Sequence, residues 1–538
     1  MSPLIEQIGL FDSLSSTRNL ILLALSLSAA ILPAWILLEY AKVLRLRRLM
    51  PPGPFPLPLV GNFFDIPKVK PWHKFEEWSK QYKDPLITLW NGHRPIIVCN
   101  DCWTISDLLE KRANIYSGRP HMVVMGDMIN GTKNNQVALG YDDSWRTHRR
   151  LTHAVVGSQA VRSHRSFQGN ETKVLLKDLL ETPNDYVMAI ERYSCSVVSI
   201  IGWGRRIEKM NDYVAQTALS FMEVVDMVVP GVYLMEAVPW LAKLPPWIYP
   251  LPTIIRQSSL HLQRYFYALS KEGAEAPQTN FAQRLLAEQQ KIGLRDAEIA
   301  SLTANLIGGG VDTTSSSMIS FILAMCVFPE AQKKAQEEID LVVGQDRMPD
   351  WDDSLPYCAA IAEEVLRWRT VTVLGGIPHA PIQDDEYRGY FIPKGTSITG
   401  NVWAIHRHPR DFPEPDVFRP ERFLDQKQPY PNKKGHNAFG WGRRQCSGQP
   451  LAEQGLGIVV ARMLWAFNIQ TGLDEKGQEV KLDIFAYTPS ENMRPKPFKA
   501  RFIPRSPQIV DTIRHSAEVA KRELAVYDSE SKLTLADV

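Results

Sequence analysis

The chain has 538 residues, 44% of them hydrophobic, so it is long enough to bury a large core and, by length alone, to form several domains. Lys and Arg number 61 against 59 Asp and Glu, a balance that excludes the bulk positive charge suited to nucleic acid. The six cysteines are sparse, which argues against a disulfide framework and favours a reducing compartment.

The first predicted element is an apolar helix, Leu20–Leu38, that carries no charge. About 20 residues at ~1.5 Å each span the ~30 Å core of a bilayer. Lys42, Arg45, Arg47 and Arg48 follow, so the positive-inside rule places the rest of the chain in the cytosol. A cleaved signal peptide is the alternative, but the run is long and its positive charge lies on the wrong side.

A proline-rich stretch, Pro51–Pro58, follows the basic residues and predicts a stiff spacer that fixes the angle between membrane and globular part. Two glycosylation sequons, at Asn130 and Asn170, would stay unmodified with this orientation.

The globular part is predicted to begin with a hairpin of Leu86–Trp90 and Pro95–Cys99 around Asn91-Gly92. A helix is expected over Thr104–Lys111. Cys99 and Cys102 form a C-x-x-C pair, which we interpret as a coincidence at a strand end because no second pair completes a zinc site.

A second helix is expected to carry Trp145 and Arg149, which lie one turn apart on one face after the acidic start Asp142-Asp143. Further along, residues 211–268 are mostly helical in pattern and are interrupted by Val238–Pro250. Trp240 and Trp247 in that interruption either pack on the domain or dip into the membrane as part of a lid.

A long uninterrupted helix is predicted over Asp296–Val327, and the chain after Arg505 is charged and weakly patterned, which predicts a surface segment. The long helix contains Gly309-Gly310-Val311-Asp312-Thr313-Thr314. Its glycines cost about 1 kcal/mol each relative to alanine, and small residues there would let a substrate or dioxygen approach the backbone. The carboxylate of Asp312 and the hydroxyl of Thr313 form an acid–alcohol pair that can relay protons; a packing kink is the plainer interpretation.

The most informative stretch is Phe439–Gly448, with the sequence Phe-Gly-Trp-Gly-Arg-Arg-Gln-Cys-Ser-Gly. Gly442 and Gly448 allow a tight turn and close approach to a flat cofactor. Arg444 favours a thiolate at Cys446 and can pair with carboxylates. A buried, packed cysteine is the simpler interpretation, but five spaced positions agree with presentation of one thiolate to iron.

Two further motifs come before this loop. Glu364 and Arg367 stand at i and i+3 on one helix face, with Arg422 downstream in Pro420-Glu-Arg-Phe423. Such spacing most often indicates a surface ion pair. His379 follows Gly375-Gly376, while His406 and His408 look like parts of an ordinary loop.

In order and composition these motifs resemble the cytochrome P450 family, over nearly the whole chain. The resemblance implies a mainly α fold with small β-sheets, the cytochrome P450 fold, preceded by one N-terminal transmembrane helix. It implies five segments: a lumenal N-terminus over 1–18, a transmembrane signal anchor over 19–39, a basic and proline-rich hinge over 40–62, a haem-thiolate catalytic domain over 63–505 and a C-terminal surface tail over 506–538.

The resemblance also implies haem b with Cys446 as the axial ligand of the iron. It implies propionate contacts from Trp145, Arg149, His379 and Arg444, with Phe439 and Gly448 beside the haem. Asp312 and Thr313 match the family's oxygen-activation motif. Glu364, Arg367 and Arg422 match its buried structural triad. Segments that match the family's substrate pocket by order alone are His121–Met128, Leu374-Gly375 and Tyr487–Asn492.

The implied reaction inserts one oxygen atom from O2 into an apolar small-molecule substrate. Electrons would come from NADPH-cytochrome P450 reductase, because the chain has no dinucleotide-binding glycine fingerprint. The expected location is the endoplasmic reticulum membrane, with the catalytic domain facing the cytosol. Tyr387–Thr396 and the cysteine loop look most like filamentous-fungal members of the O-methylsterigmatocystin oxidoreductase type. The alternatives are a haem-thiolate isomerase or dehydratase that does not use O2, and a non-catalytic haem-binding membrane protein.

Overall fold

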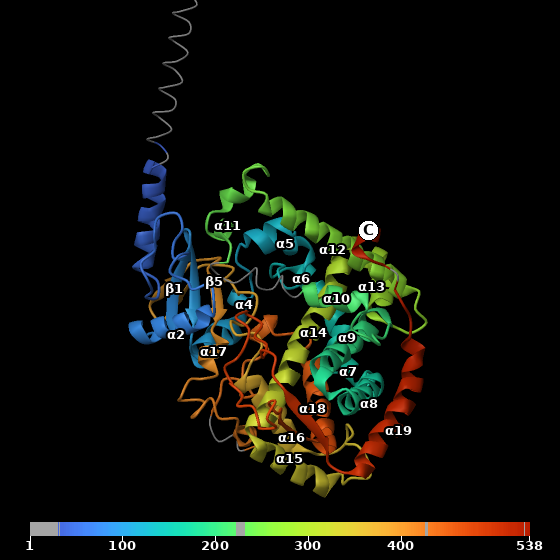
Figure 1. The fold of residues 1–538 in the computed structure, drawn as a ribbon. Helices are drawn as coiled ribbons and strands as arrows, with labels where there is room; N and C mark the ends of the chain where they lie inside the picture. The colour runs from blue at the N-terminus through green and yellow to red at the C-terminus, as the bar shows by residue number, and fades with distance from the viewer. Residues whose placement is uncertain (1–30, 32, 222–231, 425–428, 532) are drawn as a thin grey trace, which may run out of the picture.

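The computed structural model describes residues 31, 33–221, 232–424, 429–531 and 533–538. Helices dominate it, and the strands form one three-stranded sheet and two two-stranded sheets (Figure 1). The strands are β1 Leu86–Asn91, β2 Arg94–Cys99, β3 Asp385–Tyr387, β4 Tyr390–Ile392, β5 Ser397–Gly400, β6 Phe467–Thr471 and β7 Ala500–Pro504. The expected mainly α architecture with small sheets is confirmed.

The helices fall into an N-terminal and a C-terminal set. The first set is α2 Pro71–Tyr82, α3 Cys102–Ser106, α4 Ala113–Tyr116, α5 Gly131–Asn134, α6 Asp143–Val156, α7 Ala160–Ser163, α8 Arg165–Glu181, α9 Tyr186–Trp203, α10 Tyr213–Phe221 and α11 Leu234–Ala237. The second set is α12 Leu251–Ala274, α13 Phe281–Ile292, α14 Asp296–Val327, α15 Pro329–Val342, α16 Pro356–Trp368, α17 Val402–Ile405, α18 Gln449–Ala466 and α19 Pro507–Leu524.

The predicted hairpin is present: β1 and β2 pair antiparallel, and β5 joins β2 in parallel. The turn residue Gly92 has φ +64°, a conformation that glycine adopts without strain. The predicted helix over 104–111 is also present, as α3 followed by a π-helical turn, η1 Asp107–Lys111. Cys99 ends β2 and Cys102 begins α3, and both thiols are buried and free.

The core is built around α14, whose predicted bounds are confirmed. This helix contacts α9, α12, α16 and α18, and twenty of its residues are buried. By length and apolar composition α14 is the one helix in the described ranges that could cross a membrane, but 67% of its most apolar stretch is buried inside the protein. That burial is typical of a core helix.

The predicted anchor over 19–39 lies outside the described residues except for 31 and 33–39, which are helical. The proline-rich part of the predicted hinge packs onto the sheet. The Thr88 amide donates to the Pro52 carbonyl over 2.9 Å, and the Asn62 side chain accepts from the Trp90 amide over 2.9 Å. Through the Pro52 carbonyl, the proline-rich stretch therefore pairs with the edge strand β1.

The chain after Arg505, predicted to be a weakly patterned surface segment, begins with a regular helix in the structure. It forms α19, an 18-residue helix whose inner face is buried against α8. The buried positions, Ile509, Ile513, Ala517, Ala520 and Leu524, recur at helical spacing, but two of them are alanines, which contribute little to a hydrophobic pattern. The segment lies on the outside of the domain, yet one face is part of its core.

Beyond α19 the chain crosses to α10 and α12 (Figure 1). The Leu535 amide donates to the Tyr213 hydroxyl over 3.1 Å, and the Ser531 hydroxyl donates to Glu272 over 3.0 Å. Tyr213 begins α10 and Glu272 lies near the end of α12, and both helices pack on α14. The C-terminal segment therefore ties the helices that cover α14 to the rest of the domain.

Candidate active site

One internal cavity of about 380 Å³ brings most of the predicted site residues together. Its wall comes from α6, α9, α14, α18, the 370–379 segment and the cysteine loop. The predicted residues in it are Trp145, Arg149, Thr313, His379, Phe439, Arg444, Cys446 and Gly448. Motifs as far apart as residues 145 and 448 thus share one site.

The cysteine loop is held by backbone constraints. The Cys446 amide donates to the Phe439 carbonyl over 2.9 Å. Gly442 has φ +54°, and a Cβ there would lie 2.1 Å from the Leu109 carbonyl oxygen. Ser447 accepts hydrogen bonds from Arg149 over 2.7 Å and from Gln136 over 3.0 Å. The loop therefore has one well-defined path.

The thiol of Cys446 is accessible because it faces the cavity, although protein surrounds it on all other sides. Burial raises the pKa of this thiol, and the backbone amides of Gly448 and Gln449 and the charge of Arg149 act in the opposite direction. These amides open α18, so the helix N-terminus also favours negative charge on sulfur.

Three arginines line the cavity, and no Asp or Glu is among the lining residues. Burial lowers the pKa of Arg444 to about 10 and lowers the pKa values of Arg149 and Arg119. Arg444 donates to the carbonyls of Ser117 and Leu139, both over 2.8 Å, and its guanidinium lies over the Trp145 ring at 4.5 Å. Buried cations without a lining acid call for an anionic occupant.

Arg119 was missed by the sequence analysis. Its guanidinium donates to the carbonyls of Val137 over 2.7 Å and of Ile377 over 2.6 Å, next to His379. A lone arginine in an irregular loop, Gly118-Arg-Pro120, has no periodicity or motif to mark it. Only the fold shows that it joins the cationic end of the cavity.

His379 is buried, and burial followed by the charge of Arg119 lowers its pKa to about 3. Its Nδ1 lies 2.9 Å from the Tyr116 carbonyl, which can only accept, so Nδ1 carries the proton of the neutral ring. The anionic occupant that suits the arginines would also stabilise the imidazolium form of this residue.

Gly309, Gly310 and Thr313 of α14 also line the cavity. The Thr313 hydroxyl donates to the Gly309 carbonyl over 2.6 Å. Asp312 does not line the cavity; its carboxylate lies 3.7 Å from Arg494, which also pairs with Glu191. The predicted acid–alcohol pair is therefore split, because adjacent helical residues point about 100° apart.

The predicted triad is assembled and buried. Arg367 binds Glu364 with two hydrogen bonds of 2.8 and 2.7 Å, and both side chains are fully buried. Arg422 lies 3.5 Å from the same carboxylate. A surface ion pair, the plainer interpretation, is excluded by this burial.

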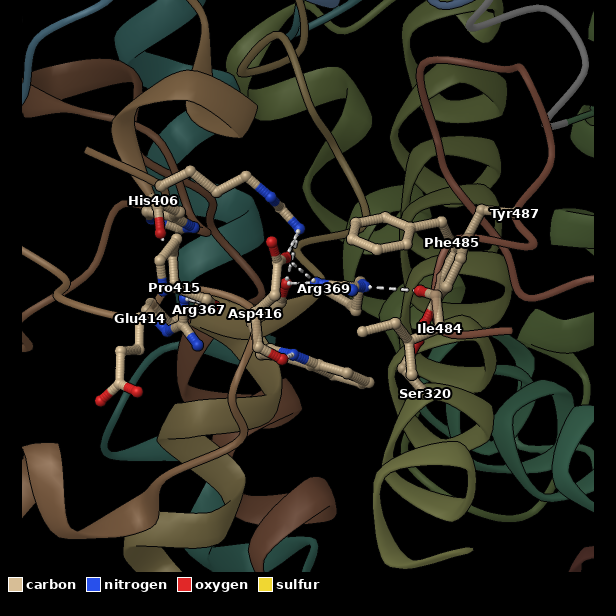
Figure 2. A network of polar contacts seen from close by, with 12 residues as sticks. Ser320, Arg367, Arg369, His406, Glu414, Pro415, Asp416, Ile484, Phe485 and Tyr487 are labelled. Carbon is tan, nitrogen blue, oxygen red and sulfur yellow. Dashed lines mark hydrogen bonds and ion pairs between the residues drawn. The ribbon is translucent and has the colours of Figure 1, made fainter. Parts of the chain in front are cut away.

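A second arginine cluster adjoins the triad. The carboxylate of Asp416 lies 3.3 Å from both Arg369 and Arg407, and Arg369 donates to the Ile484 carbonyl over 2.9 Å (Figure 2). This cluster links the end of α16 to the loop that carries Tyr487. Of the segments mapped to a substrate pocket by order, only Gly375 lines the cavity; His121–Met128 and Tyr487–Asn492 do not.

Fold and site together define a mainly helical protein whose cavity suits a flat, anionic, thiolate-ligated cofactor. The lining residues fit haem: they include the Cys446 thiol, three arginines with no lining acid, and several glycines. These residues come from segments far apart in the sequence, from Arg119 to Gly448.

Comparison with known proteins agrees with this class. The family model described as Cytochrome P450 matches residues 51–494. Cytochrome P450 monooxygenase 58 of Postia placenta is 34% identical over 480 residues, 87% of this chain and 89% of its own. Cytochrome P450 monooxygenase FrzL of Cladobotryum sp is 35% identical, over 91% and 93% of the two chains. Tryptamine 4-monooxygenase of Psilocybe cyanescens is 33% identical, over 88% and 97%.

The chain therefore belongs to the cytochrome P450 family, and it is a cytochrome P450 monooxygenase. The family implies a haem-thiolate cofactor, dioxygen and a redox partner.

Proposed function

We propose that this monooxygenase inserts one oxygen atom from O2 into an apolar small-molecule intermediate of fungal secondary metabolism. The observation that carries the proposal is the lining of one cavity. It combines Cys446 and three arginines with Thr313 and two glycines of α14. Electrons come from NADPH through a separate reductase, NADPH-cytochrome P450 reductase.

The cysteine and the cationic residues of the cavity would hold haem b. Cys446 would supply the thiolate ligand of the iron, favoured by Arg149 and the N-terminal amides of α18. Arg119, Arg444 and His379 would hold the two haem carboxylates, with the Arg444 guanidinium over the Trp145 ring. When bound, thiolate-ligated haem supplies the activation of dioxygen.

Residues of α14 would transfer protons. The Thr313 hydroxyl, placed at the cavity wall by its bond to the Gly309 carbonyl, would accept and donate a proton there. Asp312 would act from outside the cavity wall, where its carboxylate lies 3.7 Å from Arg494.

The test is reconstitution with reductase, NADPH and isotopically labelled dioxygen, using extracts of pathway intermediates as substrate. Label in a product is expected, and Thr313→Ala should lower the rate of product formation by about 100-fold or more. Thr313→Ser, which keeps the hydroxyl, should restore it.

The alternatives give different results. Product formation without dioxygen would identify an isomerase or dehydratase. Haem binding without any NADPH-dependent turnover would identify a non-catalytic haem protein.

We also propose a single-pass anchor in the endoplasmic reticulum, with the catalytic domain in the cytosol. In support, Trp240, Trp247 and Ile248 expose 53%, 84% and 50% of their surface. The loop that carries them projects at the same end of the molecule as the helix of residues 33–47 (Figure 1). An apolar loop beside an anchor fits insertion into the bilayer surface.

Glycosylation tests this orientation, and Asn130 is the simpler sequon to interpret. Asn170 is 5% exposed and donates to Glu523, so a glycan there would also disturb the fold. Asn130 is exposed. No shift of the protein on endoglycosidase treatment is expected; a shift that Asn130→Gln abolishes would place the domain in the lumen.

A further inference from the structure

His406, expected to belong to an ordinary loop, is fully buried between the arginine-rich core and the cysteine loop. It follows α17 directly, and its amide donates to the Val402 carbonyl over 2.9 Å. The neighbouring His408 is exposed over 39% of its side chain. Two histidines in one short segment therefore have opposite environments.

The backbone of His406 is tied to the triad. Arg367, which binds Glu364 with two of its nitrogens, uses its remaining Nη1 to donate to the His406 carbonyl over 3.1 Å (Figure 2). The same nitrogen donates to the Pro415 carbonyl over 2.7 Å. The position of His406 is thus fixed by the most deeply buried ion pair of the domain.

The side chain of His406 is tied to the cysteine loop. Its Nε2 accepts a hydrogen bond of 2.8 Å from the Asn437 amide. Asn437 is 1% exposed, and its carbonyl accepts from the Gly440 amide over 3.1 Å. Phe439, between those two residues, accepts from the Cys446 amide. The imidazole therefore fixes the part of the loop, residues 437–440, that positions the backbone of Cys446.

An accepting Nε2 requires the neutral ring protonated at Nδ1. Burial and the nearby charges of His436, Arg367 and Arg407 lower the pKa of His406 well below its ordinary value, so the ring stays neutral. An apolar side chain of similar volume would fill the space but leave the buried Asn437 amide without an acceptor.

We propose that His406 is a positioning residue that links the Glu364–Arg367–Arg422 triad to the cysteine loop and so maintains thiolate ligation by Cys446. It acts through Asn437 and touches neither cofactor nor substrate. Groups that orient a metal ligand from behind commonly change metal binding by about 10–100-fold when removed. The inference rests on the proposed haem-thiolate site.

The test compares three variants of the full-length holoenzyme by the absorption spectrum of the reduced, carbon monoxide-bound form. His406→Leu removes the acceptor, His406→Gln retains an amide oxygen that can accept, and His408→Leu is the matched control in the same segment. The readout is the rate at which the thiolate-type Soret band converts to the thiol-type band in mild urea, before global unfolding.

For His406→Leu we expect conversion about 10-fold faster or more than in the wild type. His406→Gln should stay within about threefold of it, and His408→Leu should match it. A purely structural role would lower the unfolding midpoint without changing the thiolate-to-thiol ratio in folded protein. If the leucine variant binds no haem, His406→Asn, whose amide stops short of Asn437, should show the same faster conversion.

Equal conversion rates in His406→Leu and His408→Leu, or no rescue by glutamine, would overturn the proposal. A wild-type protein that lacks the thiolate-type band would instead contradict the proposed site itself, so the two failures are distinguishable.

Discussion

The surroundings of the cysteine loop and the helical cover over α14 are built in different ways. The loop is fixed by several close contacts: Gly442 against the Leu109 carbonyl, the Cys446 amide on the Phe439 carbonyl, and the Ser447 hydroxyl between Arg149 and Gln136. The cover, formed by α10 and α12, is held partly by single hydrogen bonds from the C-terminal segment. The chemistry of the family needs an invariant ligand geometry on one side and room for substrate movement on the other.

The largest effect is expected on the loop side from Glu364→Ala. Removing this carboxylate leaves Arg367 buried without its bidentate partner, which costs about 3–5 kcal/mol. Haem content and urea unfolding measure the loss. Glu414→Ala is the control, because that side chain is 69% exposed and pairs only at the surface. Normal haem content in Glu364→Ala would show that the triad does not support the loop.

Gly442→Ala is the next test of the loop. The new Cβ would meet the Leu109 carbonyl at 2.1 Å and would also face a positive φ, so about 2–4 kcal/mol is expected from strain and crowding together. Gly440→Ala is matched to it, with φ +74° but open space around the Cβ, and should cost about 1 kcal/mol. Equal thermal stabilities of the two variants would refute the close-approach argument.

Arg119→Ala should weaken haem retention without unfolding the protein. Its charged hydrogen bonds to the Val137 and Ile377 carbonyls are worth about 1.5–3 kcal/mol, and its charge faces the proposed carboxylates. Haem transfer to an acceptor apoprotein measures retention. Arg150→Ala, at an exposed position beside Arg149, should leave transfer unchanged; an identical loss there would make the effect non-specific.

The smallest effect is expected on the cover side from Tyr213→Phe. It removes one acceptor of the C-terminal segment, worth about 1 kcal/mol, and should leave haem content unchanged. Hydrogen exchange in α10 and α12 should accelerate while exchange in α18 does not change. A loss of haem in this variant would mean that the two regions are not independent.

The same contrast explains what could be predicted from the sequence. The cysteine loop, the triad and α14 were predictable because their residues stand at fixed local spacings that chemistry requires, such as Glu364 and Arg367 at i and i+3. Arg119 and His406 were not, because their partners lie hundreds of residues away or on irregular loops. The side-chain direction of Asp312 was also missed, since adjacency in sequence does not place two helical residues on one face.

The C-terminal segment illustrates a third kind of failure. The apolar positions of α19 do recur at helical spacing, but Ala517 and Ala520 give little hydrophobic signal beside its charged residues. Because these alanines are small, α19 can pack closely on α8. This packing depends on the sequence of α8 as well as on that of α19, so the pattern of α19 alone does not reveal it.

The most direct test of the account is the reduced, carbon monoxide-bound spectrum of the wild type, Cys446→Ser and Cys358→Ser. The account predicts the thiolate-type Soret band in the wild type and in Cys358→Ser, whose cysteine is buried away from the cavity, and its absence in Cys446→Ser. Persistence of that band without the Cys446 thiol would contradict the assignment of this residue as the haem ligand.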